Sequence, residues 1–514
     1  MRRALVVGVA VLLASCRPGA DAREPDSVAP AVIELDVSTA QAQMKDGSLT
    51  SARLTAAYLE RIAAIDVAGP RLSAVIELNP RARAEAEALD RERAAGRVRG
   101  PLHGIPVLIK DNIDVVGMAN SAGTVLLATH RPRADAPLVA RLRAAGAVIL
   151  GKANLSEWAN LRSLRAVSGW SSRGGQTRNP YVLDRNACGS SSGTGAAIAA
   201  SLAAVGVGTE TDGSIMCPSA VNGLVGLKPT VGLVSREGII PISATQDTAG
   251  PMTRTVTEAA LVLAALAEGE PRDYVKGLSI DALQGKRIGV LRQAMGYHPD
   301  VDALTEAAVA TLVARGAEVV DPIEIATWNK WDEVALDVLL FEFKDGLNRY
   351  LKDSRAPVSS LADVIAWNRE HAVVVMPWFG QELFEQAQAK GSLDSPEYVA
   401  ARETARKLAW DEGLGAALKQ HKLDAVVAPT TGPAWPIDPV LGDRFTGSGT
   451  SMAAIAGTPS LTVPMGEIHG LPVGLAFLGK PNGEAELLAL GFAFEQETRA
   501  RKRPTYRPTI APGR

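Results

Sequence analysis

The order in which helices and strands alternate along this chain limits its fold more than any other feature of the sequence. Residues 138–155, LVARLRAAGAVILGKANL, run from a helical pattern through a glycine turn into a short apolar run. The stretch GPLHGIPVLIKDNIDV at 100–115 has a similar apolar run bounded by glycine and proline. Short continuous apolar runs are typical of strands buried on both faces, and their alternation with helices is typical of layered α/β folds. We therefore expect an α/β/α sandwich around a mixed, mostly parallel central sheet.

The domain organisation follows from length and from the absence of a linker. The chain has 514 residues, of which 46% are hydrophobic, enough for a large buried core. Strands are expected again at 285–291 and 423–431, so the second half continues the same fold. Residues 325–415 favour helix and contain many aromatic side chains, which indicates an insertion. No linker-like stretch divides the chain after the N-terminal segment, and we expect a single domain over residues 36–505.

The first residues read as an export signal. MRRALVVGVAVLLASC has two arginines and an apolar run from Ala4 to Ala14, which is too short to span a membrane. Its end, LASC, resembles a bacterial lipobox, which implies cleavage after residues 1–15 and lipidation of Cys16. Residues 16–35 would form a flexible tether, and the protein would be lipid-anchored in the bacterial cell envelope, on the periplasmic or extracytoplasmic side. The alternative is an ordinary secretory signal with a chance cysteine.

Charge and cysteine content narrow the range of partners. A formal net charge of −2 gives no basic face for nucleic acid, and no Cys/His spacing is typical of a metal site. We expect no nucleic-acid partner, no cofactor and no metal. Cys188 and Cys217 are the only cysteines left after the signal, and one possible pair is no disulfide framework. Packing among small apolar side chains is the preferred interpretation, and a thiol nucleophile is the alternative.

The stretch GTETDGSIMCPS, residues 208–219, places Ser214 in a tight turn with no histidine nearby. A serine nucleophile needs a base, and Lys110 follows the apolar run VLI, where burial would lower its pKa from about 10.4 toward 7 or 8. A third segment, CGSSSGTG at 188–195, is a loop of small residues ahead of a helix. Taken singly, each has a simpler interpretation. Lys110 would be a surface lysine, residues 188–195 would be an anion-binding loop, and Ser214 would be a turn serine.

Taken together, the three segments resemble the amidase signature family. The resemblance rests on CGSSSGTGAAIAASLAAVGVGTETDGSIMCPS, with GIPVLIKDN and GKANLSEW upstream and GLVGLKPTVGLVSREG downstream. It implies the amidase signature fold, with Lys110 as general base, Ser190 as a bridging serine after a cis Gly189–Ser190 bond, and Ser214 as nucleophile. It also implies an oxyanion hole of four backbone N–H groups, those of Thr211, Asp212, Gly213 and Ser214.

The departures from the family pattern bear on the substrate. Cys188 stands where many members have glycine, Asp212 stands where glycine or alanine is usual, and Met216 stands where arginine is common. The run GTETDGSI, with GWSSRGGQTRNP before it, is most similar to the peptide amidase branch, which implies C-terminal peptide amides or similar primary amides as substrates. The absent arginine disfavours dicarboxylic monoamides. Together with the signal, it also disfavours the A subunit of the tRNA-dependent amidotransferases.

Three further residues are interpreted near the site. Ser168 would orient Ser190 or the substrate, with a turn role as its alternative, and Thr209 would support Ser190 or the substrate. His103 is interpreted as a loop hydrogen-bonding residue. Two other functions stay open: a fatty-acid or aryl-acylamide hydrolase of the same family, and a catalytically inactive surface lipoprotein that binds amides.

Overall fold

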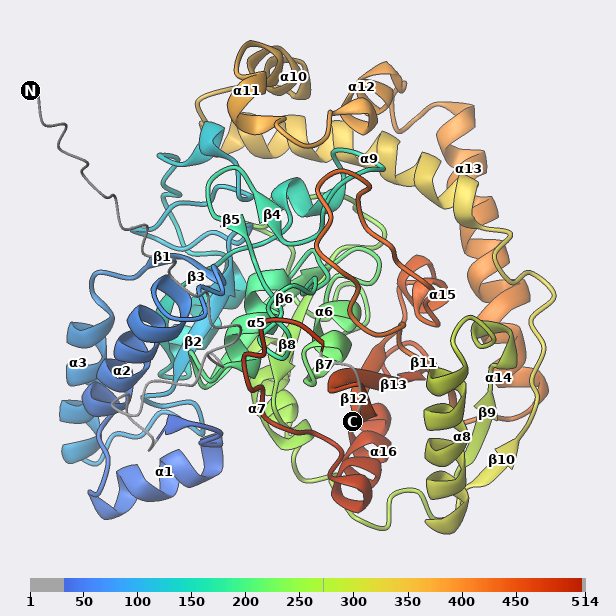
Figure 1. Ribbon diagram of the computed structural model, residues 1–514, viewed down its shortest axis with the longest axis horizontal. Helices are drawn as coiled ribbons and strands as arrows, with labels where there is room; N and C mark the ends of the chain where they lie inside the picture. The colour runs from blue at the N-terminus through green and yellow to red at the C-terminus, as the bar shows by residue number, and fades with distance from the viewer. Residues whose placement is uncertain (1–31, 271, 511–514) are drawn as a thin grey trace, which may run out of the picture.

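A central sheet of eleven strands organises the computed structural model, which describes residues 32–270 and 272–510 (Figure 1). The strands lie in the spatial order β1 (Val75–Leu78), β3 (Val148–Ala153), β2 (Pro106–Lys110), β6 (Val205–Glu210), β8 (Thr248–Thr253), β7 (Val225–Lys228), β12 (Ser460–Ile468), β13 (Leu471–Leu478), β11 (Ala425–Pro429), β9 (Arg287–Val290) and β10 (Glu318–Val320). A separate two-stranded ribbon pairs β4 (Trp170–Ser171) with β5 (Gly175–Gln176). The predicted α/β class and mixed sheet are confirmed.

The strand directions correct one part of that prediction. Six of the ten neighbouring pairs are antiparallel, and the four parallel pairs are β2 with β3, β2 with β6, β9 with β10 and β9 with β11. The sheet is therefore mostly antiparallel rather than mostly parallel. Short connections are one cause: β12 turns into β13 at His469 and Gly470, both with positive φ, as in tight hairpin turns. Such a turn reverses the chain, whereas parallel neighbours need a longer crossover.

Helices cover both faces of the sheet. They are α1 (Val37–Asp46), α2 (Ser51–Arg61), α3 (Ala82–Ala94), α4 (Pro137–Ala144), α5 (Ser192–Ala199), α6 (Met216–Val221), α7 (Val256–Leu266), α8 (Pro299–Ala314), α9 (Asp332–Asp353), α10 (Leu361–Glu370), α11 (Ala372–Val375), α12 (Glu382–Ala389), α13 (Pro396–Arg406), α14 (Gly415–Gln420), α15 (Ser451–Ile455) and α16 (Glu484–Thr498). Local signals set several of their starts. Thr50 caps α2 through its side chain, and Thr255 with Glu258 forms a capping box on α7.

The predicted insertion forms the arc of helices α9 to α13 along one side of the molecule (yellow to orange, Figure 1). The long helix α9 contributes buried Phe343 and Leu347 to a separate apolar cluster, where Phe343 stacks on Phe384 of α12. This cluster also contains Trp158, which follows β3. The arc is thus attached to the segment that follows β3 through this apolar cluster.

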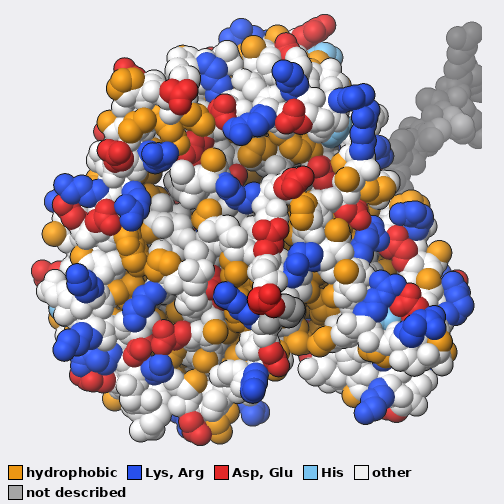
Figure 2. All heavy atoms as spheres, turned by 180° about the vertical axis from the view of Figure 1, so that it is seen from behind, with side chains coloured by type: hydrophobic (Ala, Val, Ile, Leu, Met, Phe, Trp, Pro, Cys, Tyr) orange, Lys and Arg blue, Asp and Glu red, His pale blue; other side chains and the backbone are white. Residues whose placement is uncertain are grey.

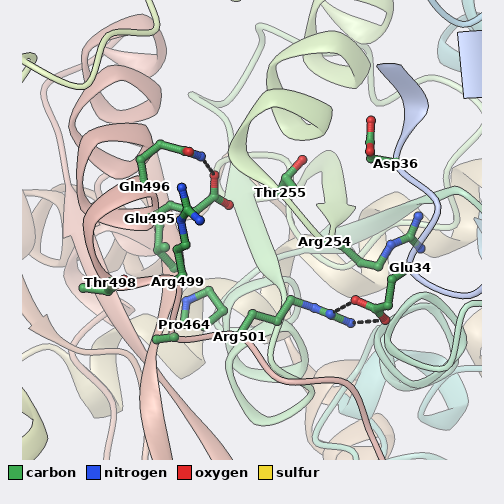
Figure 3. A pocket seen from close by; sticks show the side chains of 12 residues that line it. Glu34, Asp36, Arg254, Thr255, Pro464, Glu495, Gln496, Thr498, Arg499 and Arg501 are labelled. Atoms are coloured by element: carbon green, nitrogen blue, oxygen red, sulfur yellow. Dashed lines mark hydrogen bonds and ion pairs between the residues drawn. The ribbon is translucent and has the colours of Figure 1, made fainter. Parts of the chain in front are cut away.

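The packed domain begins before residue 36. Val32 is buried, the Glu34 backbone N–H donates to Ser201 Oγ at 3.0 Å, and Glu34 forms an ion pair with Arg501 (Figure 3). Beside this pair lies a cavity of about 270 Å³ that contains none of the predicted site residues. At the other end Tyr506 is buried, so packing also continues past the predicted limit of 505.

Cys16, the predicted signal peptide and most of the predicted tether lie outside the described residues. Within 32–270 and 272–510, none of the helices is both long and apolar enough to cross a membrane. Acidic and basic side chains are interspersed over the face seen in Figure 2, with smaller hydrophobic areas between them. This face has no extended area of a single charge.

Candidate active site

Lys110 is the last residue of β2, and its side chain is completely buried. The neighbouring parallel strand β6 ends at the same edge of the sheet, which places Thr209 beside it. Lys110 Nζ donates to Ser190 Oγ at 2.7 Å, to Thr209 Oγ1 at 2.9 Å and to the Thr209 carbonyl oxygen at 3.1 Å. The carboxyl ends of parallel strands are where α/β proteins commonly bind ligands.

The burial of Lys110 changes its acid–base behaviour. Desolvation disfavours the ammonium form and lowers the pKa of Lys110 to about 7, although the charges of Glu210 and Asp247 act in the opposite direction. None of the three acceptors around Nζ is a carboxylate. A large fraction of Lys110 is therefore a neutral amine near neutral pH, as a general base requires.

Ser190 lies at the start of the loop that enters α5. Its side chain is completely buried, its peptide bond to Gly189 is cis, and its carbonyl oxygen accepts from the Ser156 N–H at 3.1 Å. Small residues are required here: a Cβ on Gly193 of α5 would lie 2.3 Å from the Ala74 carbonyl oxygen. The helix therefore packs directly against the sheet, as the run of small residues predicts.

Ser214 lies in the turn between β6 and α6, and the adjacent loop is bonded to it. The Ser191 N–H donates to the Ser214 carbonyl oxygen at 3.2 Å, which holds the two serine-bearing loops together. Glu210 organises this turn: its carboxylate accepts the backbone N–H groups of Gly213 at 2.9 Å, Ile215 at 2.7 Å and Met216 at 2.9 Å. This role of Glu210 was not predicted from the sequence.

The bond to Glu210 corrects the predicted oxyanion hole. Because the Gly213 N–H is already donated to a carboxylate, it is not free to bind an oxyanion in this structure. The N–H groups of Thr211, Asp212 and Ser214 have no acceptor among the described residues. Thr211 is held through its side chain, whose hydroxyl donates to Asp247 Oδ1 at 2.6 Å.

Thr209 acts directly on the lysine and only indirectly on Ser190. Its hydroxyl accepts from Lys110 Nζ and, at 3.0 Å, from Asn112 Nδ2. Thr209 is buried and does not line the pocket beside the two serine-bearing loops, so it supports Ser190 through their shared contact with Lys110 Nζ. Asn112 was not identified from the sequence, although it stands two residues after Lys110.

A pocket of about 310 Å³ opens beside both serine-bearing loops, between Gly189 and Gly213. Ser168 lines it, and its hydroxyl accepts from Asn160 Nδ2 at 2.9 Å, with no bond to Ser190. Trp435 and Phe445 form part of another wall, with their rings edge to face at a centroid distance of 5.8 Å. Met216 is absent from the wall because it is completely buried in an apolar cluster.

Asp443 is a pocket residue that sequence reasoning missed. Its carboxylate accepts from the Ser168 N–H, from Asn186 Nδ2 at 3.0 Å and from Trp435 Nε1 at 3.0 Å. Burial raises the pKa of Asp443. A lone aspartate in a loop of the C-terminal region gives no signal in the sequence, because its partners are brought together only by the fold.

Asp212 also lines the pocket, and the residue is exposed to solvent. Desolvation by the surrounding protein, followed by the charge of Glu210, raises the pKa of Asp212 to about 7, and a hydrogen bond with Ser451 acts in the opposite direction. From the sequence, Asp212 was expected only to contribute its backbone N–H to the oxyanion hole. The structure gives it both a backbone N–H without an acceptor and a side chain in the pocket wall.

Cys188 and Cys217 form a disulfide across the two loops, with their Cα atoms 6.0 Å apart. The interpretation of these residues as separately packed thiols is therefore wrong, since the fold brings two residues 29 positions apart into bonding distance. Both line the pocket. The bridge links the residue before Gly189 to the third residue after Ser214.

Two other groups near the site have structural contacts. His103 Nε2 bonds the Leu89 carbonyl oxygen at 3.0 Å, in agreement with its loop interpretation. Lys152 was not identified from the sequence. Its side chain is completely buried and forms an ion pair, at 3.2 Å, with Asp111, the residue that follows Lys110 in the chain. Within the described part of the chain, no three His, Cys, Asp or Glu side chains are grouped so as to hold a metal ion.

Comparison with known proteins agrees with this geometry. The sequence model described as Amidase matches residues 53–488. A crystal structure of a peptide amidase in complex with the competitive inhibitor chymostatin is 55% identical, covers 92% of this chain and 99% of its own, and superposes with a TM-score of 0.91. The native peptide amidase from Stenotrophomonas maltophilia is 54% identical, with coverage of 92% and 98% and a TM-score of 0.88.

A plant relative extends the match beyond bacteria. The probable amidase of Arabidopsis thaliana is 39% identical over 501 residues, which cover 92% of each chain. The match to the family model spans the segments that carry Lys110, Ser190 and Ser214. The protein therefore belongs to the amidase signature family and is an enzyme that hydrolyses amide C–N bonds.

Proposed function

We propose that the protein hydrolyses C-terminal peptide amides or similar primary amides through Ser214, Ser190 and Lys110. The observation that carries the proposal is the 2.7 Å contact between the buried Lys110 Nζ and Ser190 Oγ, together with the lowered pKa of this lysine. A neutral amine in that position accepts the Ser190 proton while Ser190 takes the proton of Ser214.

In the first half of the reaction, Ser214 Oγ forms a bond to the carbonyl carbon of the substrate. Negative charge develops on the carbonyl oxygen, and the N–H groups of Thr211, Asp212 and Ser214 are the donors available to it. When the C–N bond breaks, the proton returns through Ser190 to the leaving nitrogen. Ammonia departs, and an acyl ester remains on Ser214.

In the second half, water attacks the ester carbonyl carbon and gives a proton through Ser190 to Lys110. When the bond between the carbonyl carbon and Ser214 Oγ breaks, that proton returns through Ser190 to Ser214 Oγ. The products are the free carboxylic acid and the regenerated serine. No metal or cofactor takes part in these steps. Glu210 supports both halves because it fixes the turn that presents Ser214.

The pocket supports a compact, partly polar acyl group. Its volume of about 310 Å³ and its polar wall of Ser168, Asp212 and Asp443 suit an amino-acid residue better than a long alkyl chain. The names of the similar solved structures, which are peptide amidases, point to the same substrate class. The terminal residues of a peptide amide would lie in this pocket.

We further propose that the protein is exported and lipid-anchored through Cys16. The sequence LASC after a short apolar run motivates this proposal. The Cys188–Cys217 disulfide supports an oxidising compartment, since structural disulfides persist mainly outside the cytosol. The anchor would leave the domain from Val32 onward in the envelope.

A fluorophosphonate probe tests the mechanism directly. Wild-type protein is expected to form a covalent adduct on the peptide that contains Ser214 and to release ammonia from an N-acyl dipeptide amide. Ser214→Ala is expected to lose both properties while its circular dichroism spectrum and melting temperature stay close to wild type. Ser219→Ala, a buried serine on the adjacent helix, is the matched control. A probe adduct that persists in Ser214→Ala would reject Ser214 as the nucleophile.

A further inference from the structure

The pocket beside Ser214 is rich in hydrogen-bond acceptors and contains no cation. Asp212 and Asp443 both line it, and none of its described lining residues is a lysine or an arginine. Arg444 follows Asp443 in the chain but is exposed and does not line the pocket. The pocket therefore contains two carboxyl groups with no cationic side chain in its wall.

The contacts of Asp443 leave its charge uncompensated. All its hydrogen-bond donors are neutral: a backbone N–H, the Asn186 amide and the Trp435 indole. Three of the four bonds end on Oδ1 and only one ends on Oδ2. A carboxylate offers about four lone-pair sites, so Oδ2 can accept a further donor from a ligand.

Two other features of the wall suit a cation. The amide oxygen of Asn160 is buried without a hydrogen-bond partner, which is a cost that a ligand N–H would remove. The Trp435 and Phe445 rings stand in the same wall, and aromatic faces attract ammonium and guanidinium groups. Trp435 is also oriented by its bond to Asp443.

We propose that this pocket selects amides whose acyl part carries a cationic group, such as a lysine or arginine side chain. The group would lie among the carboxyl groups of Asp212 and Asp443, the Asn160 oxygen and the aromatic wall. An anionic side chain at the same place would be repelled by the carboxylates of Asp212 and Asp443 and would find no lysine or arginine in the pocket wall, so such substrates are disfavoured. This inference rests on the proposed hydrolysis at Ser214 and adds the chemical class of its substrate.

The test compares kcat/KM for the N-acetyl amides of lysine, norleucine and glutamate at about pH 8.5, where Asp212 is ionised. Norleucine has the lysine carbon chain without the ammonium group. We expect the lysine amide to exceed the norleucine amide by about 10- to 100-fold, the reach of charge-assisted and cation–π contacts, and the glutamate amide to be slowest. The ratio between two substrates of one enzyme cancels the common contribution of Lys110.

Variants assign the preference to the pocket. In Asp212→Asn and Asp443→Asn the lysine-to-norleucine ratio is expected to fall to within about threefold. Asp438→Asn is the matched control, because Asp438 lies in the same loop, bonds the Val440 and Leu441 N–H groups and does not line the pocket. Its ratio is expected to match wild type. If Asp443→Asn does not fold, Asp212→Asn decides the test.

The possible failures are distinguishable. Equal rates for the lysine and norleucine amides in wild type would overturn the cation preference and leave the proposed hydrolysis intact. A preference that survives in Asp212→Asn and Asp443→Asn would remove the assignment to this pocket. Hydrolysis of none of the three amides, nor of an N-acyl dipeptide amide, would reject the proposed function together with this inference.

Discussion

The carboxylate of Glu210 accepts the backbone N–H of Gly213 at 2.9 Å, one residue before the proposed nucleophile. The same carboxylate accepts the Ile215 and Met216 N–H groups directly after it. A single acidic side chain thus sets the conformation of the whole turn. It does so at the expense of one N–H group that the family pattern would assign to the oxyanion.

Glu210→Gln should lower both stability and activity. The amide has one acceptor oxygen in place of two, so at least one buried N–H loses its partner, at a cost of about 1–3 kcal/mol. We expect a lower melting temperature and a lower kcat with a smaller change in KM. Glu210 also raises the pKa of Lys110, so the acid limb of kcat/KM should move to lower pH. Glu237→Gln, at an exposed site, is the control, and an unmoved limb would contradict this coupling.

The pH dependence of acylation should follow Lys110. A general base works when deprotonated, so kcat/KM of the wild type is expected to rise with pH and level off above about pH 7, where the lowered pKa lies. Lys110→Ala should reduce kcat/KM by about 10²–10⁴-fold. Lys110→Arg should not restore it, because guanidinium stays protonated at any working pH. Lys422→Ala, at an exposed lysine, should keep the wild-type profile. Near-wild-type activity of Lys110→Arg at neutral pH would refute proton transfer to this residue.

Reduction should destabilise the fold around the pocket. The Cys188–Cys217 bridge closes a loop of sequence separation 29, for which the chain-entropy estimate is about 3–4 kcal/mol of unfolding free energy. Urea denaturation with and without reductant measures this difference. The double variant Cys188→Ser, Cys217→Ser should match the reduced protein and be insensitive to reductant. Thiols can be counted in wild-type protein that lacks Cys16, after unfolding without reductant. Two free thiols in this experiment would show that the bridge is absent.

Export and anchoring make a prediction for the N-terminal cysteine. If Cys16 carries lipid, the full-length protein should fractionate with membranes, and Cys16→Ser should appear in the soluble envelope fraction. Mass spectrometry of the mature N-terminus would identify the acyl groups. A Cys16→Ser protein that stays membrane-bound would contradict the anchor and favour another mode of attachment.

Much of the fold was predictable because its strands are short apolar runs bounded by glycine. The strand that ends at Lys110 and the cap at Thr50 follow from local patterns. Strand direction was not predictable in the same way. Whether β6 pairs with β8 antiparallel or with another crossover strand depends on how the chain returns across the sheet. That path is set by long-range packing.

The residues of the candidate site also differ in whether a local sequence pattern predicts them. The loops with Ser190 and Ser214 could be found because both lie in a contiguous stretch of distinctive small residues. Asp443 could not, because two of its three partners, Ser168 and Asn186, lie 275 and 257 positions away in the sequence. The disulfide likewise depends on two loops meeting in space. A side chain whose role depends on a partner far away in the sequence cannot be identified from the residues next to it in the chain.

The close packing of α5 has a consequence for mutational tolerance. All eight of its residues are buried, and a Cβ on Gly195 would lie 2.9 Å from the Pro218 carbonyl oxygen. In a saturation mutagenesis library selected for folding alone, we therefore expect few substitutions to be tolerated at the positions of α5. A descendant that had lost catalysis would still retain these small residues. The glycine- and serine-rich stretch in a related sequence therefore indicates that the fold is retained. Whether the reaction is also retained depends on the presence of Lys110 and Ser214.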